Sequence, residues 1–189
     1  MKNNIKLTEK ITLISGNMFL SPLQTVTITV NCVGVMGKGI ALIAKNLFPD
    51  VYTHYRNICK NGQMKMGKPV LYDEKISQLY VANEEYKSVL LFPTKDHWKQ
   101  KSDILGIEQG LFWLVENYEK LGIKSLAIPA LGCGNGGLDW KYVGPILYRH
   151  LSKMNIPIHL YLPERMVPEK YLTLEYLSEK LSKITDYGQ

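Results

Sequence analysis

The chain has 189 residues, of which 46% are hydrophobic, and its formal net charge is +6. This length and composition suffice for one sizeable α/β core. We expect neither a membrane span nor a signal peptide, because there is no long apolar run and the first residues lead into a polar stretch. Cys32, Cys59 and Cys133 are too few and too scattered for a disulfide scaffold or a Cys/His metal site, so we expect a cytoplasmic protein without a metal.

Strand and helix patterns alternate along the chain. Strand patterns cover residues 11–15, 26–30, 68–72, 78–82, 88–92, 125–130 and 156–162. Helical spacing of apolar residues covers 40–48, 52–60, 102–118 and 143–154, and a further helix falls within 168–189. Ser102 and Asp103 form an N-cap region, and Gly122 is a C-terminal signal for the same helix. This order predicts an α/β fold with a mixed, mostly parallel sheet and helices on both faces.

A glycine-rich loop lies where the predicted strand 26–30 turns into the predicted helix 40–48. It contains Asn31, Gly34, Gly37 and Gly39. Glycines there let the backbone approach a ligand closely, and the free N–H groups of the following helix suit a phosphate. Glycine that merely turns the chain is the alternative, and three glycines so close together favour the ligand loop.

A second loop of the same kind follows the predicted strand 125–130. It contains Gly132, Gly134, Gly136 and Gly137 and again leads into a helical pattern. Two such loops predict two anion-contacting segments at the carboxyl ends of neighbouring strands. Neither loop fits the P-loop or the dinucleotide fingerprint, which argues against nucleoside triphosphate chemistry.

Cysteines and lysines accompany the two loops. Cys32 and Cys133 could be nucleophiles, but no histidine pattern pairs with either, so packing roles are favoured. A basic rim would attract a polyanion such as DNA or an anionic dinucleotide, with an ordinary solvated surface as the alternative. The lysines of this rim are Lys38, Lys45, Lys95, Lys99 and Lys101.

Four short motifs in a fixed order resemble a known family. They are Gly16-Asn17, VNCVGVMGKGIA at 30–41, FPTKDHW at 92–98 and PALGCGNGGLDW at 129–140. Together they resemble a macrodomain, and more narrowly the macrodomain of the DarG type. DarG is the antitoxin of DarT/DarG toxin–antitoxin systems, in which DarT attaches ADP-ribose to a DNA base and DarG removes it. The resemblance runs from about residue 11 to 161 and implies a three-layer α/β/α macrodomain over residues 1–165. Residues 166–189 then form a C-terminal helical tail, packed on this domain or extending from it.

The resemblance also implies an ADP-ribose site. Gly16 and Asn17 stand at the adenine contact, where most macrodomains carry Gly-Asp; an amide oxygen can still accept the hydrogen bond, without the charge. Asn31 matches the contact to the distal ribose. The two glycine loops match the segments that wrap this ribose and the diphosphate. Their residues are Gly34, Val35, Met36, Gly37, Lys38 and Gly39, and Gly132, Cys133, Gly134, Asn135, Gly136 and Gly137.

Lys95 matches the catalytic lysine of DarG-type and related terminal ADP-ribose glycohydrolases. Without the resemblance, a lysine after a strand would be taken for a surface cation. The related enzymes also use an aspartate in the second loop, where this chain has Gly136. Asp139 is more simply an N-cap for the following helix, so the full Lys/Asp pair is not transferred.

The function implied is a DNA ADP-ribosyl glycohydrolase that needs no cofactor. Its partners would be ADP-ribose, ADP-ribosylated single-stranded DNA and a DarT-type toxin, with no membrane, and the protein would be a monomer. Three alternatives stay open. The chain could bind ADP-ribose without turnover, or hydrolyse ADP-ribosylated protein carboxylates or O-acetyl-ADP-ribose, or act only by sequestering a toxin.

Overall fold

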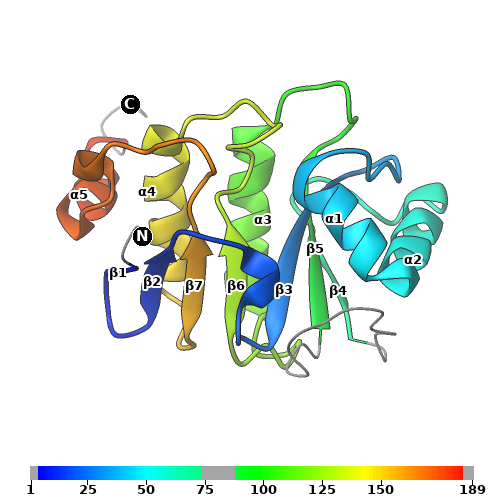
Figure 1. The fold of residues 1–189 in the computed structure, drawn as a ribbon, viewed down its shortest axis with the longest axis horizontal. Coiled ribbons are helices and arrows are strands. Elements are labelled where there is room, and N and C mark those ends of the chain that lie inside the picture. Colours follow the sequence, from blue (N-terminus) through cyan, green and yellow to red (C-terminus); the bar gives the residue numbers. More distant parts are fainter. Residues whose placement is uncertain (1–3, 74–87, 185–189) are drawn as a thin grey trace.

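One mixed sheet forms the centre of the molecule. The computed structural model describes residues 4–73 and 88–184, with side chains described up to residue 179 (Figure 1). Within these residues seven strands pair in the order β1–β2–β7–β6–β3–β5–β4. The five inner strands are parallel, and β1 and β4 are antiparallel at the edges, which confirms the mixed, mostly parallel sheet. The strands are β1 (Ile5–Lys6), β2 (Ile11–Ile14), β3 (Thr25–Asn31), β4 (Val70–Tyr72), β5 (Ser88–Lys95), β6 (Leu126–Pro129) and β7 (Ile158–Tyr161).

Helices cover both faces of this sheet. One face carries η1 (Met18–Leu20), α1 (Gly39–Leu47) and α2 (Pro49–Lys60), and the other carries α3 (Ile104–Asn117), α4 (Trp140–Leu151), η2 (Glu169–Tyr171) and α5 (Leu174–Ile184). The separation follows from the period of two along each strand. Ile28 of β3 packs in the core under α1 and α2, whereas Ile128 of β6 packs in the core under α3 and α4. The three-layer α/β/α prediction is therefore confirmed.

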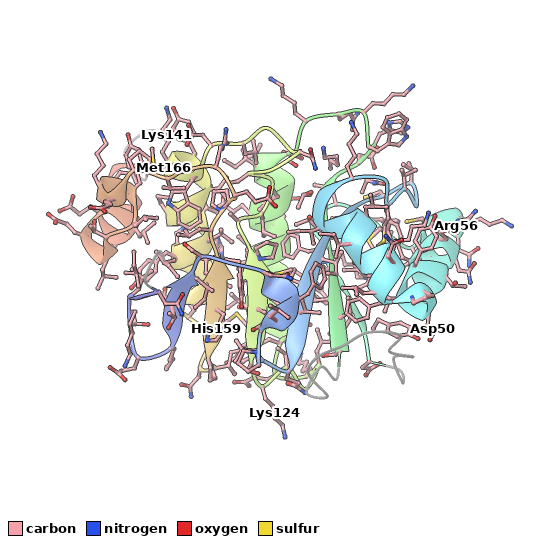
Figure 2. The ribbon with its side chains drawn as sticks, in the orientation of Figure 1. Asp50, Arg56, Lys124, Lys141, His159 and Met166 are labelled. Carbon is pink, nitrogen blue, oxygen red and sulfur yellow. The ribbon has the colours of Figure 1, made fainter. Side chains whose placement is uncertain are left out.

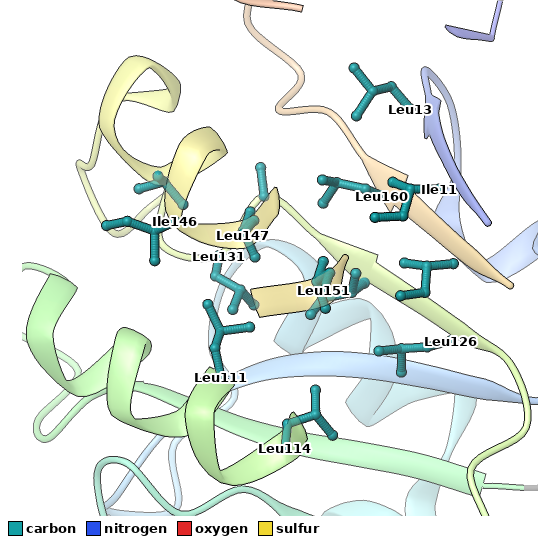
Figure 3. Packing of buried hydrophobic residues seen from close by; sticks show 14 of the residues in the cluster. Ile11, Leu13, Leu111, Leu114, Leu126, Leu131, Ile146, Leu147, Leu151 and Leu160 are labelled. Atoms are coloured by element: carbon teal, nitrogen blue, oxygen red, sulfur yellow. The ribbon is translucent and has the colours of Figure 1, made fainter. Parts of the chain in front are cut away.

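Close packing on the second face holds the helices that lead to and from the site. Leu111 and Leu114 of α3 meet Leu147 and Leu151 of α4 over the sheet (Figure 3). α3 also lies close to β5 at Gly110, where an added Cβ would lie 2.7 Å from the Phe92 ring. Glycine is therefore needed where α3 crosses β5.

The last helix packs on α4. The Trp140 indole N–H donates to the Tyr171 carbonyl at 3.0 Å, and the Tyr176 hydroxyl donates to the Lys141 carbonyl at 2.9 Å. Leu177 of α5 is buried in the same core. These contacts tie the described part of the tail to the sheet domain.

One predicted strand cannot be compared with the structure, one observed strand was not predicted, and β5 is longer than predicted. The predicted strand 78–82 lies outside the described residues. The edge strand β1 was not predicted, because two residues are too short to show a pattern. The strand predicted to end at residue 92 continues to Lys95 through Pro93. There the pairing with β3 shifts, so that Val30 faces Pro93 but Asn31 faces Lys95. Such a bulge redirects the side chains that follow it.

Candidate functional site

The predicted site residues come together at one edge of the sheet. Gly16 and Asn17 follow β2, the first glycine loop follows β3, Lys95 ends β5, and the second glycine loop follows β6. These strands are parallel, so their carboxyl ends lie side by side, at the top of Figure 1. In open α/β sheets, ligands bind at this edge.

The two glycine loops leave the sheet toward opposite faces. β3 and β6 are neighbours, but they pair only at their first residues, Thr25 and Val26 with Leu126 and Ala127. β3 continues beyond this pairing to Asn31. The loop after β3 leads to α1 on one face, and the loop after β6 leads to α4 on the other. From β3 the sheet continues to β5 on one side, and from β6 it continues to β7 on the other side. The direction in which strands are added therefore reverses between β3 and β6, and open α/β sheets bind ligands at such a point.

Asn31 fixes the shape of the first loop, residues 32–38. Its side-chain oxygen accepts from the N–H groups of Val33 (3.1 Å) and Val35 (3.3 Å), and its amide nitrogen donates to the Val35 carbonyl at 2.6 Å. The Tyr55 hydroxyl donates to the Asn31 carbonyl at 2.8 Å and lies 3.0 Å from its side-chain oxygen. In this structure Asn31 is buried and braces the loop; its contact to a distal ribose stays a prediction.

Tyr55 is a site residue that sequence reasoning missed. It lies on α2 and its side chain is fully buried. Burial also raises the pKa of its hydroxyl, so the group stays a proton donor to Asn31. No local signal distinguishes it from an ordinary core aromatic, because its partner lies 24 residues earlier in the chain.

The start of α1 offers free backbone donors. Lys38 occupies the N-cap position in extended conformation and makes no side-chain cap hydrogen bond. The first N–H groups of the helix therefore have no side-chain acceptor and suit an anion. Gly39 is the first helical residue, and a Cβ added there would lie 2.7 Å from the Asn135 side-chain nitrogen. The two glycine loops thus touch across the site.

Internal hydrogen bonds shape the second loop, residues 130–139. The Gly134 carbonyl accepts from Gly137 N–H at 3.1 Å, and the Gly132 carbonyl accepts from Leu138 N–H at 3.0 Å. A Cβ at Gly136 would lie 2.4 Å from the Gly132 carbonyl oxygen and 2.2 Å from the Ser102 hydroxyl. An aspartate at position 136 would therefore require a different loop. Gly134, by contrast, has nothing within 4 Å of an added Cβ and faces open space.

Asp139 and Asp103 are helix caps. Asp139 accepts from Lys141 N–H at 3.0 Å at the start of α4, and Asp103 accepts from Leu105 N–H at 3.0 Å at the start of α3. Both predictions are confirmed. Because Asp139 already caps α4, the uncapped start of α1 is the better anion site of the two.

Lys95 lies where the β5 loop meets the second glycine loop. Its ammonium donates to the carbonyl of Gln100 at 2.9 Å and to that of Asn135 at 3.3 Å. The side chain is half-buried, and this burial lowers the pKa of the amine. Within residues 4–73 and 88–179 it forms no ion pair. The two carbonyls hold the nitrogen in place without neutralising its charge.

The cysteines at the two loops are poor nucleophiles. Burial raises the pKa of the Cys32 thiol to about 12, and the nearby Asp96 carboxylate adds to the effect. Burial likewise raises the pKa of Cys133 to about 12. Thiols with such values stay protonated near neutral pH. This supports packing roles for both residues.

The adenine end of the predicted site lies after β2. Gly16 has φ +150°, and the Asn17 side-chain oxygen accepts from Phe19 N–H at 3.0 Å at the start of η1. Asn17 is exposed. Its oxygen thus helps to shape this turn, and its contact to an adenine stays a prediction.

The predicted basic rim is divided between two places. Lys38, Lys99 and Lys101 lie in the loops at the carboxyl edge of the sheet and are exposed. Lys45 lies near the end of α1, beside Tyr52 of α2. Among the described residues no group of His, Cys, Asp and Glu side chains is placed to hold a metal ion, and no helix is long and apolar enough to cross a membrane.

Comparison with known proteins gives the class of this fold. The Macro domain family model matches residues 28–147. The chain therefore belongs to the macrodomain family. Within that family its resemblance to the DarG type is confirmed by the relatives described next.

Two solved structures and one curated relative support the assignment. A structure of Thermosipho africanus DarTG in complex with ADP-ribose is 51% identical in sequence to this chain and superposes with a TM-score of 0.87. The match covers 93% of this chain and 47% of the DarTG chain. The macrodomain of Mycobacterium tuberculosis DarG is 39% identical with a TM-score of 0.74, covering 81% of this chain and 97% of that one. A Thermosipho africanus DNA ADP-ribosyl transferase–DNA ADP-ribosyl glycohydrolase fusion protein is 50% identical over 183 residues, 92% of this chain. The chain spans 47% of that relative and 36% of a Mycobacterium tuberculosis DNA ADP-ribosyl glycohydrolase.

Proposed function

We propose that this domain binds ADP-ribose between the two glycine loops and hydrolyses its bond to a DNA base. The observation that carries the proposal is the placement of Lys95. Its ammonium lies at the meeting point of the β5 loop and the second glycine loop, held by two carbonyl oxygens. A domain that only bound ADP-ribose would have no need for a cation held there. The names of the relatives at 50% and 43% identity agree with this activity.

The reaction breaks the bond between C1 of the distal ribose and a nitrogen of the base, and water supplies the new oxygen on C1. Positive charge develops on the sugar, while the base leaves with the bonding electron pair and takes up a proton. The glycine loops hold the diphosphate through backbone N–H groups, so the sugar is fixed before reaction.

Lys95 can assist in either of two ways. As an ammonium it stabilises the negative charge that develops on the leaving base. As a neutral amine it attacks C1 and forms a transient imine with the opened sugar, which water then hydrolyses. The burial that lowers the pKa of Lys95 increases the neutral fraction and so serves the second route.

We further propose that the substrate is supplied by a DarT-type transferase. The relative that is a fusion of a DNA ADP-ribosyl transferase and a glycohydrolase places both activities in one chain. A hydrolase of this kind reverses the modification that such a transferase makes.

The substrate class is tested by incubating the chain with ADP-ribosylated single-stranded DNA and, separately, with ADP-ribosyl-glutamate protein. We expect release of free ADP-ribose from the DNA only, at a rate that falls with added salt because phosphate contacts are screened. Clearance of the modified protein with no action on DNA would replace the proposal by a protein-directed hydrolase. Binding of ADP-ribose with turnover of neither substrate would make the domain a binding module.

A further inference from the structure

A hollow adjoins the first glycine loop and the helix α2. It encloses about 950 Å³ between residues 32–37 and the exposed face of α2, with Lys45 of α1 at its border. This volume is within the range of sites that hold a nucleotide-sized ligand. None of the sequence motifs assigned a role to this face of α2.

The charged side chains that line this hollow are all basic. They are Lys45, Arg56 and Lys60, and no Asp or Glu is among the lining residues. Tyr52, Arg56 and Lys60 are spaced by four residues and therefore share one face of α2. The outward position of Arg56 on α2 is seen at the right of Figure 2.

The Tyr52 ring makes cation–π contacts with two of these side chains. The Lys45 ammonium lies 4.7 Å from the centre of the Tyr52 ring, and the Arg56 guanidinium carbon lies 5.9 Å from it. Cation–π attraction of this kind orients long side chains that would otherwise sample many rotamers. The hollow therefore presents positive charge in a partly fixed arrangement.

The hollow begins next to the proposed catalytic lysine. Cys32, the first residue of its wall, donates its N–H to the Asp96 carbonyl at 2.8 Å, and Asn31 is the strand partner of Lys95. The backbone that forms this wall is therefore paired with the backbone at and directly after Lys95. The exposed side chains of Val33 and Val35 line the same wall and offer apolar contact.

We propose that this hollow binds the DNA strand that flanks the modified nucleotide, with Lys45, Arg56 and Lys60 contacting its phosphates. The inference rests on the proposed function, which requires a substrate with a polyanionic strand on at least one side of the scissile bond. In the proposed function, free ADP-ribose or a modified nucleoside contacts only the two glycine loops and Lys95. A DNA strand continues past Lys95, and the basic hollow is an adjoining surface with the charge to hold it.

The test compares two double variants that each lose two exposed positive charges. One is Arg56→Ala with Lys60→Ala in the hollow. The control is Lys120→Ala with Lys124→Ala, and Lys124 lies at the opposite end of the sheet (Figure 2). All four side chains are exposed, so both variants should fold, which thermal unfolding checks. Each is assayed on a long single-stranded oligonucleotide with one ADP-ribosylated base and on the corresponding ADP-ribosylated deoxynucleoside.

We expect the hollow variant to lose on the order of tenfold in kcat/KM on the oligonucleotide and nothing on the nucleoside, which has no flanking phosphates. The control variant should retain the wild-type preference between the two substrates. The inference would be overturned if the ratio of kcat/KM on the oligonucleotide to kcat/KM on the nucleoside were the same in wild type and in the hollow variant. An equal loss on the oligonucleotide in the control variant would overturn it as well.

A binding measurement separates this inference from the proposed function. Fluorescence anisotropy with an unmodified single-stranded oligonucleotide needs no turnover. The hollow variant should bind more weakly and show a slope of log K against log salt that is smaller by about 1.4, since each lost phosphate contact on a single strand contributes about 0.7. If wild type hydrolyses neither modified substrate, the proposed function fails, while an unchanged salt slope in the hollow variant rejects the hollow as a strand site.

Discussion

Lys95 is the residue whose surroundings say most about the chemistry. It is held by the carbonyls of Gln100 and Asn135 and lies beside Asn31 because of the bulge in β5. In the proposed reaction, Lys95 acts on charge that develops only as the glycosidic bond breaks. On this proposal, a change at Lys95 should affect turnover and leave ground-state binding nearly unchanged.

For Lys95→Ala we expect turnover to fall by about a hundredfold or more, with ADP-ribose affinity close to that of wild type. Single-turnover kinetics and calorimetry measure the two quantities. Full activity in this variant would remove Lys95 from the mechanism.

Lys95→Arg separates the two routes. Arginine keeps the positive charge but is effectively never neutral and forms no imine. Strong activity in the arginine variant would favour stabilisation of the leaving base. Loss in both variants leaves the covalent route open, and borohydride trapping of wild type with substrate then tests directly for the imine.

Gly134 tests the position of the diphosphate. An added Cβ at Gly134 meets no atom within 4 Å, so Gly134→Glu adds a carboxylate to the second glycine loop without a clash at its Cβ. We expect ADP-ribose affinity in calorimetry to fall strongly because of volume and charge repulsion, while the melting temperature stays near that of wild type. Unchanged affinity would mean that the diphosphate lies elsewhere.

Sequence reasoning identified residues whose role depends on their neighbours in the chain. Asp103 and Asp139 were predicted as caps because capping is a contact across two or three residues. The pairing of Tyr55 with Asn31 was not predicted, since it depends on how α2 packs against the end of β3. The clash that excludes an aspartate at Gly136 was also missed, because Ser102 comes from another loop.

Among the helices and strands, most boundaries followed from periodicity, and the differences have local causes. α3 begins at Ile104, just after its capping Asp103. β5 extends three residues beyond its predicted end, because a proline at a shifted register does not stop this strand. The bulge itself has no sequence signature here, and it decides where Lys95 lies.

The close packing of α3 on β5 can be tested by its effect on stability. An alanine at Gly110 would place its Cβ 2.7 Å from the buried Phe92 ring. Alanine favours a helix by up to ~1 kcal/mol over glycine, but overpacking costs about 1–3 kcal/mol, so we expect net destabilisation. Urea unfolding measures the change in the free energy of unfolding. Gly134→Ala, which meets no atom within 4 Å, is the matched control and should leave the free energy of unfolding unchanged.

For the molecule as a whole, the buried His150 and the half-buried His159 link stability to pH. Burial lowers the pKa of His150, which lies 3.5 Å from Glu108, and burial also lowers the pKa of His159, 3.4 Å from the Ser21 hydroxyl. Their folded pKa values are below the ordinary value of 6.5. The unfolded chain therefore binds more protons as the pH falls through 6.5, and the folded state loses stability in that window.

We expect the melting temperature to fall as the pH is lowered from about 7.5 to about 5.5, before most carboxylates titrate. A His150→Gln variant should show a shallower dependence over the same range. A wild-type melting temperature that does not change across this range would contradict the link between stability and the lowered pKa values of His150 and His159.

The brace between Asn31 and Tyr55 has a consequence for the thermodynamics of association. A loop that became ordered only around its ligand would lose roughly 1–2 kcal/mol of backbone entropy per residue at the moment of binding. Here residues 33 and 35 are already held by the Asn31 side chain, which is anchored in turn to a buried tyrosine. The ordering entropy of this loop is lost when the chain folds, so most of the interaction energy with a diphosphate remains available as affinity.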